Sequence, residues 1–184
     1  MSWTLIHLNE ITPVLWRNGG GVTRELLAWP SPGDWAFRIS VAEVERDGPF
    51  SPYPGVQRWF AVLSGGGVRL TVAGQARELR ALGQPFRFDG GADTQCELLA
   101  GPTQDFNLML RQGSASVRRV HGSHTATCKA GTFVAAYSLQ GNTAVRRGVE
   151  LPEIPPNVLA WRILDSDGQL ELLGENALWM EIAP

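Results

Sequence analysis

A set of polar residues in the first two thirds of the chain has the chemistry to bind a small carboxylate. It combines arginines, acids and neutral hydrogen-bonding side chains: Arg38, Arg58, Glu25, Asp105, Asn18, Thr23 and Asn107. An arginine presents a planar fork of N–H donors that matches both oxygens of a carboxylate. We therefore predict that the arginines anchor an anion, that the amides and the threonine hydrogen-bond it, and that the acids orient the arginines.

Strand alternation could bring these side chains to one place. Successive residues of a strand point to opposite faces, so Thr23 shares a face with Glu25, and Arg38 shares one with Ser40. In a closed barrel one face of every strand points inward, where a charge must be paired or bound to a ligand. A third polar face of this kind holds Asp105, Asn107, Met109 and Arg111.

Three arrangements of the polar set stay open. The arginines and the acids could form a network that satisfies itself and leaves no group for a ligand. One guanidinium could instead remain free to bind a carboxylate with two hydrogen bonds. The polar faces could also point outward, and they would then form a solvated surface.

The stretch from Trp16 to Leu26 contains three consecutive glycines, Gly19-Gly20-Gly21. Glycine is favoured where the backbone takes a positive φ or approaches another group closely. We expect the run at the rim or floor of the pocket and Trp16 in its wall, with a flexible hairpin loop as the alternative. A side chain at Gly20 should then damage binding more than folding. No Lys-Ser/Thr pair follows the glycines, so a phosphate loop is not expected.

The elements that must position these residues are β-strands. Alternation, β-branched residues and frequent glycine and proline predict an all-β chain of roughly 14 strands, the clearest at Trp35–Val44. That number favours two packed barrel-like or jelly-roll-like halves over one small sandwich. We expect these domains at residues 1–112, with the pocket, and 113–184. Local turn or loop chemistry is expected at His121-Gly122-Ser123-His124, Gln140-Gly141-Asn142 and Gly174-Glu175-Asn176.

Composition limits the classes of partner. The chain has 184 residues and a net charge of -2, with a pI near 5.9, which argues against binding to nucleic acid or anionic membranes. No secretion signal and no apolar run of about 20 residues is visible, so we expect a cytoplasmic protein. Cys96 and Cys128 are expected as free thiols, with a disulfide between them as the alternative. The sequence leaves a homodimer open.

Sequence blocks in the first 111 residues, taken together and in order, resemble the HutD/Ves family. The resemblance implies a cupin-like fold with two barrels, a bicupin. It also implies an association with bacterial histidine utilisation, and a regulatory role there through binding of an intermediate such as formylglutamate. The blocks are Trp16–Glu25, Arg38–Ala42 with Asp47–Ser51, Arg58–Gly65, and Phe88–Gly90 continuing through Gly101–Met109; Tyr53–Gly65 and Gly83–Phe88 are also similar to cupin elements.

No metal or cofactor is expected. Metal-dependent cupins hold iron, manganese or zinc with histidines and a carboxylate, but the corresponding strand, Gln57–Leu63, carries Arg58 and no histidine. His121 and His124 have no third ligand near them in the sequence. Cys96 has no partner suited to nucleophilic catalysis, and a Gly-x-Ser-x-Gly elbow is absent from the sequence.

Three functions follow from these observations. The first is a metal-independent cupin-like protein that binds a small carboxylate and governs histidine utilisation. The second is an isomerase or hydrolase of the same intermediates, with Glu25 or Asp105 as general acid or base. The third is a protein-interaction module with a vestigial pocket. We favour the first and assign no catalytic residue.

Overall fold

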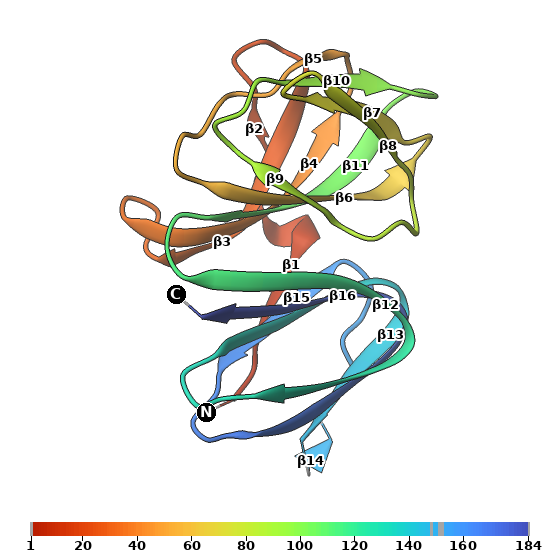
Figure 1. Cartoon of the computed structure of the whole chain (residues 1–184). Helices are drawn as coiled ribbons and strands as arrows, with labels where there is room; N and C mark the ends of the chain where they lie inside the picture. The colour runs from red at the N-terminus through yellow and green to blue at the C-terminus, as the bar shows by residue number, and fades with distance from the viewer. Residues whose placement is uncertain (1, 148, 151–152, 184) are drawn as a thin grey trace. The chain divides into compact units, whose positions relative to one another are not determined.

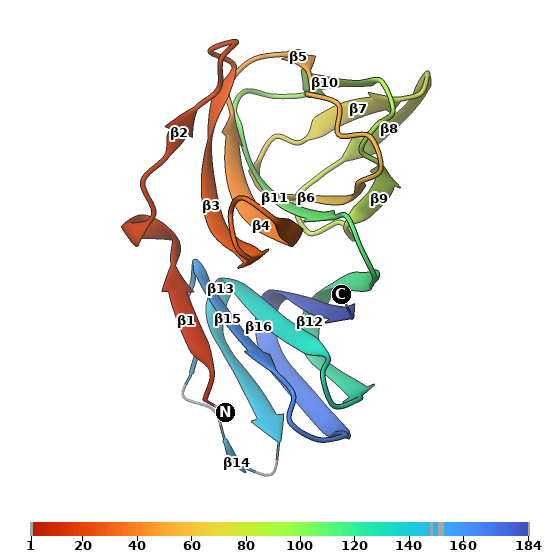
Figure 2. The same cartoon turned by 90° about the vertical axis from the view of Figure 1, so that its left-hand side faces the viewer.

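The computed structural model describes residues 2–147, 149–150 and 153–183 (Figure 1, Figure 2). Its chain divides into two compact units, one of residues 11–112 and one of residues 1–10 with 113–184. Strand β1 (Thr4–His7) pairs with β15 (Val158–Ile163). Thr4–His7 lie in the same compact unit as β15, because their backbone hydrogen bonds are made with that strand.

The prediction of an all-β chain is confirmed. In the 11–112 unit, one antiparallel sheet runs in the order β2-β3-β4-β11-β6-β9 and another in the order β5-β10-β7-β8. The strands of the first sheet are β2 (Val14–Leu15), β3 (Gly21–Pro30), β4 (Trp35–Val44), β11 (Thr103–Leu110), β6 (Gln57–Gly65) and β9 (Phe86–Asp89). Those of the second are β5 (Gly48–Pro49), β10 (Thr94–Leu98), β7 (Val68–Val72) and β8 (Gln75–Leu79).

The apolar core of the 11–112 unit lies between its two sheets, which face each other in Figure 2. On β6, Phe60 and Val62 point to the same face as Arg58, because they are separated from it by even numbers of residues. The inner face of the large sheet is thus charged at one end and apolar at the other. The apolar end contributes Val44, Phe60 and Val62, and the small sheet contributes Val68, Leu70 and Cys96.

The other unit is built on one sheet in the order β1-β15-β13-β16-β12, with β14 paired to β13. A short 3-10 helix, η1 (Leu8–Glu10), follows β1. The apolar core of this unit includes Ala136, Leu172 and Trp179. The strands not yet named are β12 (Ser114–Cys128), β13 (Phe133–Arg147), β14 (Val149–Glu150) and β16 (Gly168–Ala183).

Three predicted breaks in this unit are wrong, because each lies inside a long strand. The segment 121–124 belongs to β12, 140–142 to β13 and 174–176 to β16. The pairing register shifts beside each of them, between Val120 and Gly122 in β12 and between Ser138 and Thr143 in β13, where Gly174 faces Thr143. Glycine and small polar residues mark β-bulges here, which use the same residue types as turns.

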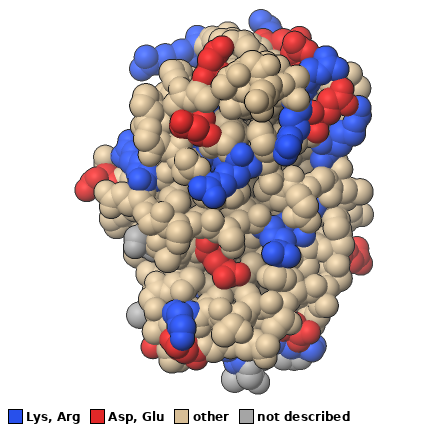
Figure 3. All heavy atoms as spheres, viewed as in Figure 1, with Lys and Arg blue, Asp and Glu red and all other residues tan. Residues whose placement is uncertain are grey.

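Across the described residues, no helix has the length and hydropathy needed to cross a bilayer. Both cysteines, Cys96 and Cys128, are buried free thiols. On the face drawn in Figure 3, acidic and basic side chains are interspersed rather than gathered into one patch of either sign.

Candidate functional site

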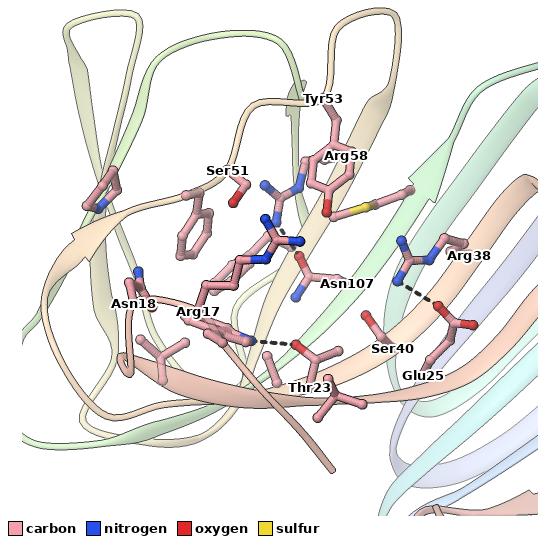
Figure 4. Close-up of a pocket in the computed structure, with 18 of the residues that line it drawn as sticks. Arg17, Asn18, Thr23, Glu25, Arg38, Ser40, Ser51, Tyr53, Arg58 and Asn107 are labelled. Atoms are coloured by element: carbon pink, nitrogen blue, oxygen red, sulfur yellow. Dashed lines mark hydrogen bonds and ion pairs between the residues drawn. The ribbon is translucent and has the colours of Figure 1, made fainter. Parts of the chain in front are cut away.

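A cavity of about 700 Å³ opens in the 11–112 unit at the charged end of the large sheet (Figure 4). Its floor comes from the inner faces of β3, β4, β11 and β6, and its rim from residues 14–18 and 49–53. A volume of this size is typical of a small-molecule site. The predicted site residues that line it are Asn18, Thr23, Glu25, Arg38, Arg58 and Asn107.

Strand register explains how residues far apart in the sequence meet on this floor. Met109 on β11 is paired with Arg38 on one side and with Arg58 on the other. Neighbouring strands lie about 4.8 Å apart, so the two arginines leave the backbone about 10 Å from each other. One row further along, Asn107 is paired with Ser40 and Phe60.

Arg58 is a buried cation with a neutral partner. Its side chain is only 5% exposed, and its Nη2 donates to Oδ1 of Asn107 at 2.8 Å. The guanidinium carbon lies 5.0 Å from the ring centre of Phe50 and 5.2 Å from that of Phe88. Among the described residues no carboxylate pairs with Arg58, and its Nε has no hydrogen-bond partner. Burial lowers the pKa of Arg58 to about 10, which still leaves it protonated at neutral pH.

Arg38 is paired, in contrast to Arg58. Its Nη2 lies 2.6 Å from Oε2 of Glu25, and both side chains are partly exposed (Figure 4). The guanidinium carbon of Arg38 also lies 5.4 Å from the ring centre of Trp35. Arg38 therefore has an acidic partner in Glu25, although its Nε, like that of Arg58, has no hydrogen-bond partner.

Asp105 lies beyond the cavity lining, although it shares the face of Asn107. It is fully buried, and its strand neighbours are Ala42 and Val62. Oδ2 accepts a hydrogen bond from the Thr103 hydroxyl at 2.6 Å, and Oδ1 has no partner. Burial raises the pKa of Asp105 to about 7, although the Thr103 hydrogen bond opposes that rise. The carboxylate pairs with neither cavity arginine, so the expected orienting contact is not formed.

Asn18 and Thr23 line the cavity with part of their hydrogen-bonding capacity already used. The Asn18 Oδ1 accepts from the backbone N–H of Gly20 at 3.0 Å. The Thr23 hydroxyl oxygen accepts from Nε1 of Trp16 at 2.7 Å, and this bond fixes the Trp16 ring in the cavity wall. The amide N–H₂ of Asn18 and the O–H of Thr23 are the donors left for a ligand.

The glycine run was expected at the rim or floor of the pocket, but none of Gly19, Gly20 and Gly21 lines the cavity. Gly19 takes a positive φ of 67°, as the tight turn before β3 requires. A Cβ at Gly21 would lie 2.1 Å from the carbonyl oxygen of Glu43, so the close approach is to the backbone of β4. At Gly20 the nearest atom to an added Cβ would be Oδ1 of Asn18, at 3.2 Å.

Several lining residues were missed from the sequence. Arg17 projects over the cavity in Figure 4, and it is exposed. Phe50, Ser51 and Tyr53 come from the proline-rich segment after β5, which was predicted only as a rigid loop. Phe50 packs edge-on against Trp16 at 6.4 Å between ring centres. The sequence signal that could have indicated these residues is the presence of two aromatic residues in a loop that glycine and proline make rigid.

The charge of the lining is positive. Arg17, Arg38 and Arg58 face the cavity, and Glu25 is the acid that faces it. This excess is local, because the whole chain carries a net charge of -2. Among the described residues, no group of three or more His, Cys, Asp or Glu side chains is arranged to hold a metal ion.

Comparison with known proteins gives one family. A model of the HutD family matches residues 9–178. Protein Ves of Cronobacter sakazakii is 34% identical over 167 residues, which cover 85% of this chain and 89% of that protein. An uncharacterised 21.2 kDa protein from the hutC 3′ region of Pseudomonas putida is 36% identical over 107 residues, 57% of this chain. That second match spans just over half, 56%, of the P. putida protein.

Solved structures agree with this result. HutD from Pseudomonas fluorescens SBW25, from a formate condition, superposes with a TM-score of 0.87 at 27% identity, covering 100% of both chains. Protein Ylba from Escherichia coli has a TM-score of 0.70 at 11% identity and covers 99% of this chain and 91% of its own. At 11% identity, the likeness to Ylba concerns the fold alone. That fold is cupin-like, as predicted.

Proposed function

Because the chain belongs to the HutD/Ves family, we propose that it binds a small carboxylate in the cavity at Arg58 and acts as a metal-independent regulator of histidine utilisation. The observation that carries this proposal is that Arg58 is buried and charged, and that its hydrogen-bond partner, Asn107, is neutral. A buried charge is costly unless it is paired. Here one neutral amide holds the guanidinium, and the side chain faces a cavity large enough for a ligand.

The chemistry of the cavity favours an organic carboxylate. The Arg58 fork can bind two oxygens of one carboxylate, and Arg38 and Arg17 can attract a second anionic group. Tyr53, Ser51 and the free donors of Asn18 and Thr23 supply neutral hydrogen bonds around these charges. An intermediate such as formylglutamate has two carboxylates for the arginines and one amide for the neutral hydrogen-bonding groups.

The regulatory part of the proposal has a separate support. The P. putida relative is described by its place beside hutC, and the resemblance of this chain is to a family associated with histidine utilisation. A protein that binds a pathway intermediate through fixed donors can report the level of that intermediate. The alternative of an acid/base enzyme now depends on Glu25, because Asp105 does not line the cavity.

Calorimetric titration tests the proposal. Protein treated with a metal chelator is titrated with formylglutamate, and we expect saturable binding to one site per chain. The same mixture is then followed for turnover by chromatography, and the ligand should stay unchanged. Absence of binding to formylglutamate and to other histidine-degradation intermediates contradicts the proposal, and conversion of the ligand favours the enzyme.

A further inference from the structure

Two exposed apolar residues border the same cavity. Val14 and Leu15, which form β2, are 66% and 78% exposed, and both line the cavity that contains Arg58. Single exposed apolar side chains are ordinary on protein surfaces. These two lie at the edge of the sheet, beside the apolar wall formed by Trp16 and Phe50. Val14 is paired with Thr23, which also lines the cavity, whereas Leu15 is paired with Val22, so Val14 is the side chain on the cavity face.

Two polar groups of the wall beside β2 already have partners within the protein. Nε1 of Trp16 is already bonded to Thr23, and Oδ1 of Asn18 is bonded to the backbone of Gly20. The lining also includes the apolar residues Ala42, Val44 and Phe60. A ligand group that lies along this wall gains by being apolar, because removing apolar surface from water is favourable.

The distance across the cavity sets the size of such a group. Strand β2 lies four positions from β6 in the sheet, after β3, β4 and β11. At about 4.8 Å per strand this is about 19 Å along the sheet, and the curvature of a barrel makes the direct path shorter. A ligand of only a few carbons anchored at Arg58 leaves the β2 side of a cavity of about 700 Å³ uncovered.

We propose that Val14 and Leu15 form an apolar subsite, and that the site takes carboxylates carrying an apolar arm, such as acylated amino acids with a hydrocarbon acyl group. The inference rests on the proposed carboxylate site at Arg58 and adds a second, separate requirement. The charged head binds at Arg58 and the arm extends toward β2, where its contact shields exposed apolar surface from water.

A series of ligands with one head and a growing arm tests this subsite. N-formyl-, N-butanoyl- and N-benzoyl-L-glutamate are titrated calorimetrically into the full chain. We expect the benzoyl compound to bind roughly tenfold or more tightly than the formyl compound, as burial of a ring-sized apolar group predicts. Equal or weaker binding along the series overturns the subsite but leaves the carboxylate site intact. Failure of every compound to bind overturns both.

Matched variants locate the effect. Leu15→Ser and Val14→Ser change exposed side chains at β2, and Leu82→Ser changes a side chain that is 60% exposed and does not line the cavity. The first two should reduce the advantage of the benzoyl compound to about threefold or less, and the control should keep it. An advantage that survives both Val14→Ser and Leu15→Ser overturns the proposal. Sedimentation of the ligand-free protein gives a second check. If Leu15→Ser lowers its mass, a second copy of the chain covers these residues in the native protein, and the proposal is overturned.

Discussion

The guanidinium of Arg58 donates to the amide oxygen of Asn107 over 2.8 Å, so a buried cation is held by a neutral group. This contact leaves the charge of Arg58 without an acidic partner among the residues that the structure describes. It also fixes the direction of the guanidinium, which lies between the rings of Phe50 and Phe88. A ligand carboxylate therefore meets a donor fork that is already ordered, and it loses little entropy in aligning it.

The first prediction concerns Asn107→Asp. This change places a carboxylate within hydrogen-bonding reach of Arg58, which has no acidic partner in the described part of the chain. The variant should fold, and its affinity for formylglutamate should fall at least roughly tenfold, because the new acid occupies the fork and repels the ligand. Calorimetry measures the affinity, and circular dichroism checks the fold. Undiminished affinity in a folded variant contradicts the role given to Arg58.

The second prediction concerns the pH dependence of stability. The pKa of Asp105 is about 7 in the folded protein against an ordinary 3.8, because of burial. Between these values the folded state holds a proton that the unfolded state has lost, so stability falls as pH rises from about 4 to about 7 and then levels. The total loss is a few kcal/mol, at about 1.4 kcal/mol for each pKa unit.

Urea unfolding of the native protein and of Asp105→Asn, measured from pH 4.5 to pH 8, checks this effect. The stability difference between the two should change in favour of the variant as pH rises, because the amide carries no charge at any of these values. Parallel stability curves would show that Asp105 ionises normally.

The third prediction separates two neighbouring glycines. Gly21→Ala places a Cβ 2.1 Å from the carbonyl oxygen of Glu43, which is backbone and cannot move aside cheaply. We expect a loss of about 2–4 kcal/mol in the free energy of unfolding. Gly20→Ala meets only the Asn18 side chain at 3.2 Å, so its stability should change by less than about 1 kcal/mol. Chemical denaturation measures both, and equal losses would contradict the contact pattern.

The strands that build the cavity could be predicted from the sequence because their alternation is regular. Trp35–Val44 was predicted with the bounds that β4 has, and the face with Arg38 and Ser40 does line the cavity. The long strands β12, β13 and β16 were divided because bulges and turns use the same small and polar residues.

The partner of each cavity arginine could not be predicted from alternation alone. Alternation placed Asp105 on the face of Asn107, but register decides which row a residue occupies, and Asp105 lies one row deeper than Asn107. Residues on irregular segments, such as Arg17 and Phe50, have no periodicity that could assign them to the site. The role of the glycine run could not be predicted for the same reason, because the close contact of Gly21 is with a residue of β4, which comes later in the sequence.

The affinity of Arg58 variants for formylglutamate tests the central claim most directly. Arg58→Ala should weaken calorimetric binding by about 1–3 kcal/mol, and Arg58→Lys, which keeps the charge but loses the fork, should lie between it and the native protein. Arg80→Ala is the matched control, since Arg80 is exposed and does not line the cavity. If folded Arg58→Ala and Arg80→Ala bind as tightly as the native protein, Arg58 does not anchor the ligand and the proposed site is wrong.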